Sequence, residues 1–478
     1  MVLREVKSKI TQKKAVADWI VFLVLLLLIQ GALLWMDHQP MFFFGDSESY
    51  IWTAIAGRLP TDRSFVYGYF IHLVAVTTQS LTSLVIAQVL LLIAASAVMA
   101  HLLIRYFRVR PCIAFIASLL TSLEPLQLLY TRYVMTETLA LFIFVFYIWV
   151  VLHYLEDPRI KWLCLSHGIA VAMISVRFAF IPLVWICALS IPILAFPAIA
   201  AQARLTSAKT TARLALHVVM SVFLLSIFTS AYKHVHGYLQ HKPPAYSYDS
   251  GYFAMGYVVP ILEPEDFPDV NLGSRVFGDL NFSVKDRRVR ASHRWMEGGA
   301  VSRLQKLEPD RIKAEAIARR AALHAVIHKP LAFLHLGWQT FTDYFDPSYL
   351  RSSMKADLGN RRLEDGFHNL IKTRFHYSLD TSSALDLKTP TGRYFLNSER
   401  WIQFLLFVPL FWGLLSVYTS DTDQRRKILL MGLISLTFIG VALLLVERPT
   451  PRYLHGSAWL FFLMAGVGLN NFFVFERF

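Results

Sequence analysis

The sequence predicts an all-α polytopic membrane protein with about ten transmembrane helices. Of its 478 residues, 55% are hydrophobic and only 17% are charged, whereas a soluble protein carries about 25% charged residues. Apolar runs recur along the chain, each near the roughly 20 residues that a helix needs to cross a bilayer. The lipid bilayer is therefore an expected partner.

The elements follow from these runs in chain order. Residues 1–17 are basic, and the first run is interpreted as a signal anchor because no small-residue cleavage site follows it. Seven spans are expected within 18–231, with a first outer loop at 37–80 that holds short juxtamembrane helices, and three more within 401–478. The expected spans lie near 18–36, 81–104, 111–129, 135–155, 161–176, 179–199, 212–231, 401–419, 428–446 and 456–475.

Lysine and arginine positions orient these spans. With the basic N-terminus in the cytoplasm, the short basic loops all fall on the inner side, as the positive-inside rule requires. These loops are 105–111, 156–161, 203–213 and 420–427. Membrane topology thus accounts for the net charge of +14, and we expect no nucleic-acid partner.

Residues 232–400 are polar and contain no convincing span, so we expect an outer loop domain of mixed structure. Within it a juxtamembrane helix is expected near 311–345, broken or kinked at Pro330. Its apolar part, "PLAFLHLGW", is too short to span and should lie on the membrane face. A re-entrant or spanning course for 321–345 remains an alternative, and spanning would reverse the last three spans.

The stretch "GDSESY" places Asp46 and Glu48 just beyond the first span. In an extended segment, residues two apart point to the same side. Two such carboxylates can hold a divalent metal, or raise one another's pKa so that one acts as a base. The simpler alternative is an ordinary acidic loop.

Two further outer positions carry charge beside hydrocarbon, where charge is costly and often functional. Glu137, in "YTRYVMTETL", begins an expected span, where a carboxylate also suits the helix macrodipole. Arg132 is a candidate partner for it or for a phosphate. Arg177, in "VAMISVRFAFIPLV", lies at an outer turn and could equally be a snorkelling structural arginine.

The last outer loop, "VERPTPRYLHGSAWL", contains Arg448, Arg452 and Tyr453. Guanidinium groups bind phosphate in a planar, bidentate way, although these could also anchor lipid headgroups. Carboxylates and arginines from four loops are therefore expected to converge at the outer leaflet. A lipid-phosphate sugar would need such a site, because its phosphate needs cations and its acceptor hydroxyl needs a base.

Three stretches resemble the GT-C superfamily of polytopic glycosyltransferases, which includes the protein mannosyltransferases and the aminoarabinose transferases. "GDSESY" is similar to the family's first-loop catalytic aspartate motif, and "RYVMTETL" to its second acidic position. "RPTPRYLHGSAWLFFLMAGVGL" resembles the arginine-bearing loop and final helix of many members, and "SVRFAFIPLV" a mid-chain arginine followed by proline. The likeness covers 18–200 closely and 400–475 loosely.

The resemblance implies a role for each matching residue. Asp46 would be the catalytic base or an acceptor-orienting carboxylate, and Glu48 takes the D-x-E partner position. Glu137 would position the donor phosphate or, with Asp46, hold a divalent metal such as Mg²⁺ or Mn²⁺. We further expect substrate contacts from Tyr50, Arg63, Tyr67, Arg132, Arg177, Arg448, Arg452 and Tyr453.

The implied function is that of an inverting glycosyltransferase. It would move a sugar from a polyprenyl-phosphate donor to a hydroxyl on a glycan, lipid or protein acceptor. We expect a bacterial inner membrane, a cytoplasmic N-terminus and a site facing the periplasm.

Two rival functions and two local alternatives stay open at this point. An O-antigen-type ligase or polymerase could use the basic stretch 285–295, and a transporter or flippase would need charged or broken helices at the midplane. His324, His328 and His335 have a spacing that can bind zinc. The tyrosines could stack on a sugar or form the core of a small domain; they are Tyr246, Tyr248, Tyr252 and Tyr257.

Overall fold

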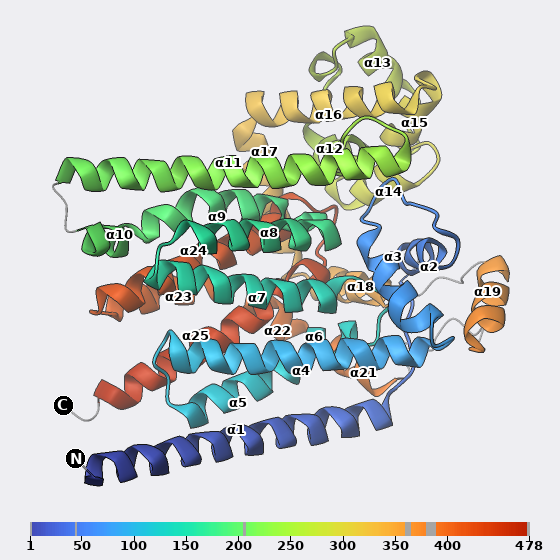
Figure 1. Cartoon of the computed structure of the whole chain (residues 1–478). Coiled ribbons are helices and arrows are strands. Elements are labelled where there is room, and N and C mark those ends of the chain that lie inside the picture. Colours follow the sequence, from blue (N-terminus) through green and yellow to red (C-terminus); the bar gives the residue numbers. More distant parts are fainter. Residues whose placement is uncertain (1, 44, 204–206, 359–364, 379–388, 476–478) are drawn as a thin grey trace.

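The computed structural model describes residues 2–43, 45–203, 207–358, 365–378 and 389–475. These residues form helices and loops, apart from one isolated bridge between Met41 and Tyr133. The predicted all-α class is confirmed for this part of the chain. The long helices lie side by side, and both termini lie at one end of the bundle (Figure 1). We call this end the terminal end and the opposite one the site end.

Six segments of the described chain are long and apolar enough to cross a membrane. They are Lys14–Met36 of α1 (Val2–Met36), α4 (Leu81–Arg105), α7 (Glu137–Glu156), Phe178–Ala201, Ala208–Gln240 of α11 (Ser207–Gln240), and α24 (Thr422–Leu444). Phe178–Ala201 comprises η2 (Phe178–Phe180), α9 (Ile181–Leu194) and most of α10 (Phe196–Ala203). The bent pair α22 (Glu399–Leu405) and α23 (Val408–Tyr418) would make a seventh span. These segments are compatible with an integral membrane protein.

The span expected at 111–129 is instead two helices, α5 (Pro111–Ser122) and α6 (Pro125–Tyr130). Pro125 has no N–H to continue the helix, and it restricts the preceding Glu124 to an extended conformation. The Glu124 side chain then caps α6 by accepting from Gln127 N at 2.9 Å. A proline therefore ends α5 at 12 residues.

Proline also breaks the segment expected at 401–419. Pro409 lies at the start of α23, and the axes of α22 and α23 differ by 48°. Two other expected spans form single helices, α8 (Ile160–Val176) with 17 residues and α25 (His455–Phe475) with 21. The number of about ten transmembrane helices therefore stays a prediction.

The first outer loop contains short helices, as expected: α2 (Asp46–Ala56), α3 (Val66–Ile71) and the π-helix η1 (His72–Val76). Helices α2 and α3 approach closely at Gly68, where an added Cβ would overlap the side chain of Thr53. Tyr67 OH donates to Gln88 Oε1 of α4 at 2.6 Å. This contact attaches the loop to the bundle.

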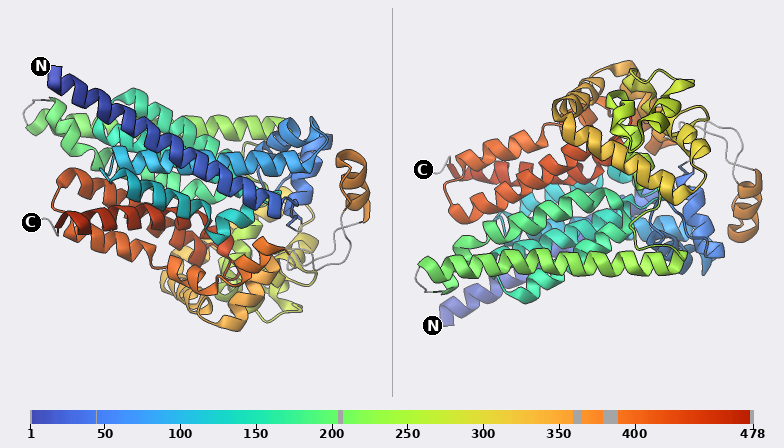
Figure 2. Two further views of the ribbon diagram at one scale, coloured as in Figure 1. Left: turned by 90° about the horizontal axis from the view of Figure 1, so that it is seen from below. Right: turned by 90° about the horizontal axis from the view of Figure 1, so that it is seen from above.

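We call residues 232–400 the 232–400 domain. Its described part is helical and lies at the site end, so the expectation of mixed structure is not met there, and residues 232–240 continue α11 (Figures 1 and 2). Residues 252–325 have a core of their own, to which Tyr252, Met255 and Leu304 contribute, whereas Leu350 and Phe395 belong to the bundle core. The elements of the domain are α12 (Ser250–Val258), η3 (Val259–Ile261), η4 (Pro264–Asp266), α13 (Val270–Gly278), η5 (Arg287–Val289), α14 (Arg290–Trp295), α15 (Ala300–Leu307), α16 (Arg311–His328), α17 (Pro330–Asp343), α18 (Pro347–Asp357), α19 (Asp365–Phe375) and α21 (Pro390–Leu396).

The helix expected near 311–345 is broken at Pro330, as predicted, into α16 and α17. Helix α17 packs against α24, where a Cβ on Gly337 would come within 2.5 Å of Leu444. The opposite side carries exposed apolar side chains at helical spacing across the break. We call them the apolar stripe: Leu323, Ile327, Leu331, Leu334 and Trp338.

Basic loops gather at the terminal end of the bundle. Lys427 is 1% exposed there and lies 2.8 Å from Glu156 Oε1 and 2.7 Å from Asp423 Oδ2. Arg105 pairs with the same glutamate at 3.2 Å. The loop at 203–213 belongs to this end, but its residues 204–206 lie outside the described chain.

Candidate functional site

Five charged side chains from separate segments meet at the site end. They form the acid–arginine cluster: Asp46, Arg63, Glu137, Arg177 and Arg452. Arg452 Nη1 donates to Asp46 Oδ2 at 2.6 Å, and its Nε donates to Glu137 Oε1. Arg177 Nη1 lies 2.7 Å from that glutamate oxygen, and Arg63 pairs with Asp46 Oδ1. One guanidinium thus joins both carboxylates.

The cluster is largely removed from solvent. Glu137 is 0% exposed and Asp46 is 17% exposed. Burial alone would raise the pKa of Asp46, but Arg63 and Arg452 outweigh burial and lower it to about 2. Pairing is needed because isolated buried charges cost several kcal/mol. Asp46 is therefore ionised at neutral pH and held between two arginines.

Backbone contacts bring Asp46 and Glu137 together. Met41 N donates to Arg132 O at 2.8 Å, and Val134 N donates to Met41 O at 2.9 Å. Ser47 Oγ donates to Val134 O at 3.0 Å and accepts from Phe43 N at 2.8 Å. These bonds align the start of α2 with the segment that enters α7.

Local backbone conformation directs the side chains of Glu137 and Arg177 into the cluster. Glu137 is the first residue of α7, where the helix dipole favours a carboxylate. Arg177 has extended backbone angles (φ −149°, ψ 114°) between α8 and η2. Its Nη2 also donates to Arg452 O at 3.2 Å. Arg177 therefore contacts Glu137, which is a side-chain partner of Arg452, and also the backbone of Arg452.

Residues 445–454, which we call the clamped loop, present Arg452 to the carboxylates. Asp357 of α18 accepts from Arg448 Nη2 at 3.1 Å and from Thr450 Oγ1 at 3.2 Å. Thr450 N donates to Tyr344 OH at 3.0 Å, and Arg294 of α14 pairs with Glu447. Burial raises the pKa of Asp357, against the lowering effect of Arg448. The 232–400 domain therefore positions this loop.

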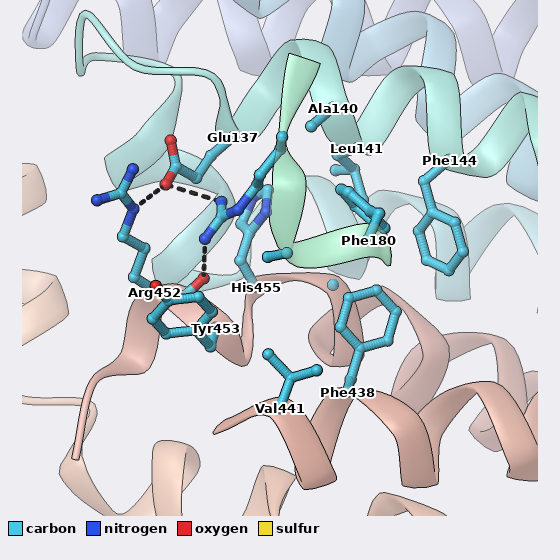
Figure 3. Close-up of a pocket in the computed structure, with 13 residues that line it drawn as sticks. Glu137, Ala140, Leu141, Phe144, Phe180, Phe438, Val441, Arg452, Tyr453 and His455 are labelled. Carbon is cyan, nitrogen blue, oxygen red and sulfur yellow. Dashed lines mark hydrogen bonds and ion pairs between the residues drawn. The ribbon is translucent and has the colours of Figure 1, made fainter. Parts of the chain in front are cut away.

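A small cavity of about 20 Å³ adjoins the cluster (Figure 3). Its polar side carries Glu137, Arg177, Arg452, Tyr453 and His455. Its apolar side is lined by Ala140, Leu141, Phe144, Ala179, Phe180, Phe438 and Val441. Two arginines face one carboxylate on the polar wall, so guanidinium groups of the kind that bind anions lie beside a hydrocarbon surface.

The remaining sequence-predicted residues lie around the cluster. Tyr50 and Tyr67 are buried and pack edge to face at 5.0 Å, and Arg63 lies 5.8 Å from the Tyr50 ring. The Arg177 guanidinium carbon lies 5.4 Å from the centre of the Tyr453 ring, and Arg448 forms an ion pair with Asp357. These contacts keep the predicted residues near the site.

Two sequence-based placements are corrected. Arg132 does not pair with Glu137: it donates to Thr131 Oγ1 at 3.2 Å and is 1% exposed. Burial lowers its pKa to about 10, with Asp37 as the opposing charge. Asp46 and Glu48 lie in the first turn of a helix and not in an extended segment, so they point about 200° apart.

Sequence reasoning missed Asp62 and Asp357 as members of the surrounding network. Asp62 accepts from Arg63 Nε at 3.0 Å. Adjacency to Arg63 could have indicated Asp62. Asp357 had no such signal, because its partners lie about 90 residues away, at Arg448 and Thr450.

The basic stretch 285–295 is engaged in contacts within the protein. Arg287 lies 2.7 Å from Asp343, and Arg288 lies 2.9 Å from Asp346. Arg290 is 2% exposed and donates to Thr340 Oγ1 at 2.9 Å. These contacts give the stretch a structural role that the ligase alternative did not anticipate.

The histidines considered for zinc and the tyrosines considered for sugar stacking also make contacts within the protein. His324 Nδ1 lies 2.9 Å from Asp266 Oδ1, and within the described ranges no three His, Cys, Asp or Glu side chains form a metal-ligand group. Tyr252 and Tyr257 contribute to the core of residues 252–325. Tyr246 packs against the bundle core, and Tyr248 is 8% exposed. The core interpretation is favoured for the tyrosines.

Asp46 and Glu137 do not fit a divalent metal as they are arranged. A metal needs carboxylate oxygens directed at one point, but the Arg452 guanidinium lies between these two carboxylates. Arg63 and Arg177 add positive charge on either side.

Comparison of the chain with protein-family models, curated proteins and solved structures finds no match.

Proposed function

We propose that this protein is an inverting glycosyltransferase. It moves a sugar from a polyprenyl-phosphate donor to an acceptor hydroxyl at the outer face of a membrane, as the GT-C resemblance implies. One observation carries the proposal: Arg452 joins Asp46 and Glu137 beside a cavity with an apolar wall, at one end of an apolar helical bundle. A lipid-linked anionic sugar matches this combination of charge and hydrocarbon.

The proposed topology has about ten spans, a cytoplasmic terminal end and an outward-facing site end in a bacterial inner membrane. Shared placement of both termini supports an even number of crossings (Figure 1). Basic loops at the terminal end follow the positive-inside rule. The apolar stripe on α16 and α17 would rest on the outer membrane surface, because exposed apolar side chains are favourable against lipid.

The donor would bind at the cavity, which must widen to admit it, because about 20 Å³ holds only about one water molecule. Its phosphate would meet Arg177 and Arg452, and the first units of its polyprenyl chain would follow Phe144, Phe180 and Phe438. Guanidinium groups at fixed positions offset phosphate charge most strongly away from water. Burial of the chain against aromatic rings contributes about 25 cal/mol per Å².

The reaction forms one bond and breaks one. The acceptor oxygen attacks the anomeric carbon from the face opposite the phosphate, and the bond from that carbon to the phosphate oxygen breaks. The acceptor proton passes to Asp46, and the lipid phosphate leaves with its charge held by Arg177 and Arg452. Acceptors of three classes carry such a hydroxyl: glycans, lipids and proteins.

Donor binding would also adjust Asp46. A carboxylate with a pKa of about 2 is a weak base. A phosphate that competes for Arg452 would remove part of the charge that lowers this pKa, while burial would continue to raise it. Asp46 would then gain basicity only when the donor is bound.

The decisive experiment measures sugar transfer by purified, detergent-solubilised protein with a panel of radiolabelled polyprenyl-phosphate sugars. We expect Asp46→Asn to lose about 10²–10⁴-fold in rate while remaining folded. Glu265→Gln, at an exposed carboxylate of the outer domain, is the matched control. Full activity of Asp46→Asn would contradict the base assignment. Wild-type protein that turns over no donor would contradict the proposed function and favour the lipid transporter.

A further inference from the structure

His455 lines the cavity, and the proposed reaction leaves its imidazole unused. Its side chain is 3% exposed, and its Nε2 has no hydrogen-bond partner among the described residues. It lines the cavity with Glu137, Arg177 and Arg452 (Figure 3). A buried polar atom without a partner is destabilising, so its presence needs an explanation.

The surrounding structure fixes the orientation of this imidazole. The Tyr130 ring packs edge to face against it, at 5.0 Å and 82°. Gln127 Nε2 donates to His455 O at 3.3 Å. Behind it, a Cβ on Gly456 would overlap the ring of Phe438, so the start of α25 cannot shift toward α24. The ring is therefore held in place at the cavity wall, and its Nε2 is without a partner among the described residues.

We propose that His455 is a substrate-contacting residue whose Nε2–H donates a hydrogen bond to the phosphate of a polyprenyl-phosphate ligand. The inference rests on the proposed function and adds a third donor to the two arginines. The charged groups that face His455 are Glu137 and Arg177. An anion held by Arg177 and Arg452 would lie on the same cavity wall as the imidazole.

The test measures binding of undecaprenyl phosphate and of undecaprenol, which lacks the phosphate, to purified full-length protein in detergent. We expect His455→Phe to weaken phosphate binding by about tenfold or more, because hydrogen bonds to charged groups are the strong ones. Binding of the alcohol should be unchanged. His455→Gln, whose amide can replace Nε2–H, should retain phosphate binding within about threefold, whereas His455→Asn, with a shorter side chain, should not.

Each contrary result is distinct. Equal phosphate binding by His455→Phe and wild type, with loss in Arg452→Ala, would overturn the role of His455 and leave the donor site standing. Equal loss of phosphate and alcohol binding would also overturn it, because the ring would then only shape the cavity. Wild-type protein with no preference for the phosphate would overturn both this inference and the proposed donor class. Thermal unfolding of each variant reports its folding, and His455→Gln and His455→Asn replace any His455→Phe protein that fails to fold.

Discussion

At the scale of single residues, the bridging role of Arg452 determines the character of the cluster. Its guanidinium reaches Asp46 and Glu137 through different nitrogens. A lysine carries one ammonium and cannot bond both carboxylates with the same fork geometry. The site therefore depends on an arginine here for reasons of shape as well as charge.

We expect Arg452→Lys to lower sugar transfer by about 10²-fold, because both carboxylates lose a fixed partner in the transition state. Steady-state transfer by the purified protein tests this expectation. Arg351→Lys, at an exposed pair with Glu399 of 3.0 Å, is the matched control and should stay active. Arg452→Lys with wild-type activity would mean that charge alone is required.

The lowered pKa of Asp46 predicts a pH-dependent contribution to stability. Its folded pKa of about 2 lies below the ordinary value of 3.8. The stabilisation is therefore present above about pH 4 and is lost as the pH falls through about 2. Over that window it amounts to about 2 kcal/mol.

Thermal unfolding of detergent-solubilised wild type and Asp46→Asn between pH 2 and pH 6 checks this prediction. The stability difference between the two should be largest near pH 6 and should shrink by about 2 kcal/mol toward pH 2. Glu265→Gln should show no such convergence. A difference that is constant across this range would place the Asp46 pKa at its ordinary value.

At the scale of elements, the clamped loop connects the 232–400 domain to the cluster. Asp357 accepts from both Arg448 and Thr450, so its charge fixes the loop that carries Arg452. We expect Asp357→Asn to keep the protein folded but to lower transfer by about tenfold, because one charge-assisted bond is lost. Rates and thermal unfolding of Asp357→Asn and of the control Glu399→Gln test this. A drop in both variants would indicate a general loss of stability.

Close packing of α2 on α3 gives a second prediction at this scale. An added Cβ at Gly68 would overlap Thr53, and overpacking costs about 1–3 kcal/mol. Gly68→Ala should therefore lower the unfolding temperature and, by shifting α2, reduce transfer. Gly31→Ala, in α1 with nothing within 4 Å of its added Cβ, is the matched control. Unchanged stability of Gly68→Ala would show that the two helices separate freely.

Sequence reasoning located elements better than it located their breaks. The long apolar runs of α4, α7 and α24 need only hydropathy to be identified, and the structure has them as single helices. The 111–129 run fails because Pro125 interrupts hydrogen bonding without lowering hydropathy much. A sequence-wide hydropathy average does not register such a break, although a proline-based rule could have found it.

The site shows the same division between local and distant information. Asp46, Glu137, Arg177 and Arg452 stand out because charge beside hydrocarbon is costly, and the structure brings them together. The sharing of Arg452 by two carboxylates could not be predicted, because it depends on how distant loops fold. The helical start of α2 likewise overrode the extended geometry assumed for Asp46 and Glu48.

At the scale of the whole molecule, both termini lie at one end of the bundle, and α2, which begins at Asp46, lies at the other (Figures 1 and 2). The proposed topology therefore makes opposite predictions for two positions. Cys112, an exposed cysteine at the terminal end, should be shielded from reagents outside the cell. A cysteine introduced as Glu265→Cys should be accessible to them.

Labelling of intact cells with a membrane-impermeant maleimide tests this orientation. In a background with Cys164 and Cys187 replaced by serine, we expect Glu265→Cys to be labelled directly and Cys112 only after permeabilisation. Labelling of Cys112 in intact cells would place the terminal end outside and reverse the proposed orientation. Equal labelling at both positions would argue against a bundle that separates two compartments.

The contact between Met41 and the 132–134 segment has an evolutionary consequence. It is made by main-chain atoms, which every residue except proline can supply as donor and acceptor alike. Substitutions among apolar residues at positions 41 and 134 can therefore accumulate over long lineages while the register of the two acidic segments stays fixed. Distant homologues of this chain would then keep the spacing of a few charged residues around hydrophobic helices, while the identity of the residues between them changes.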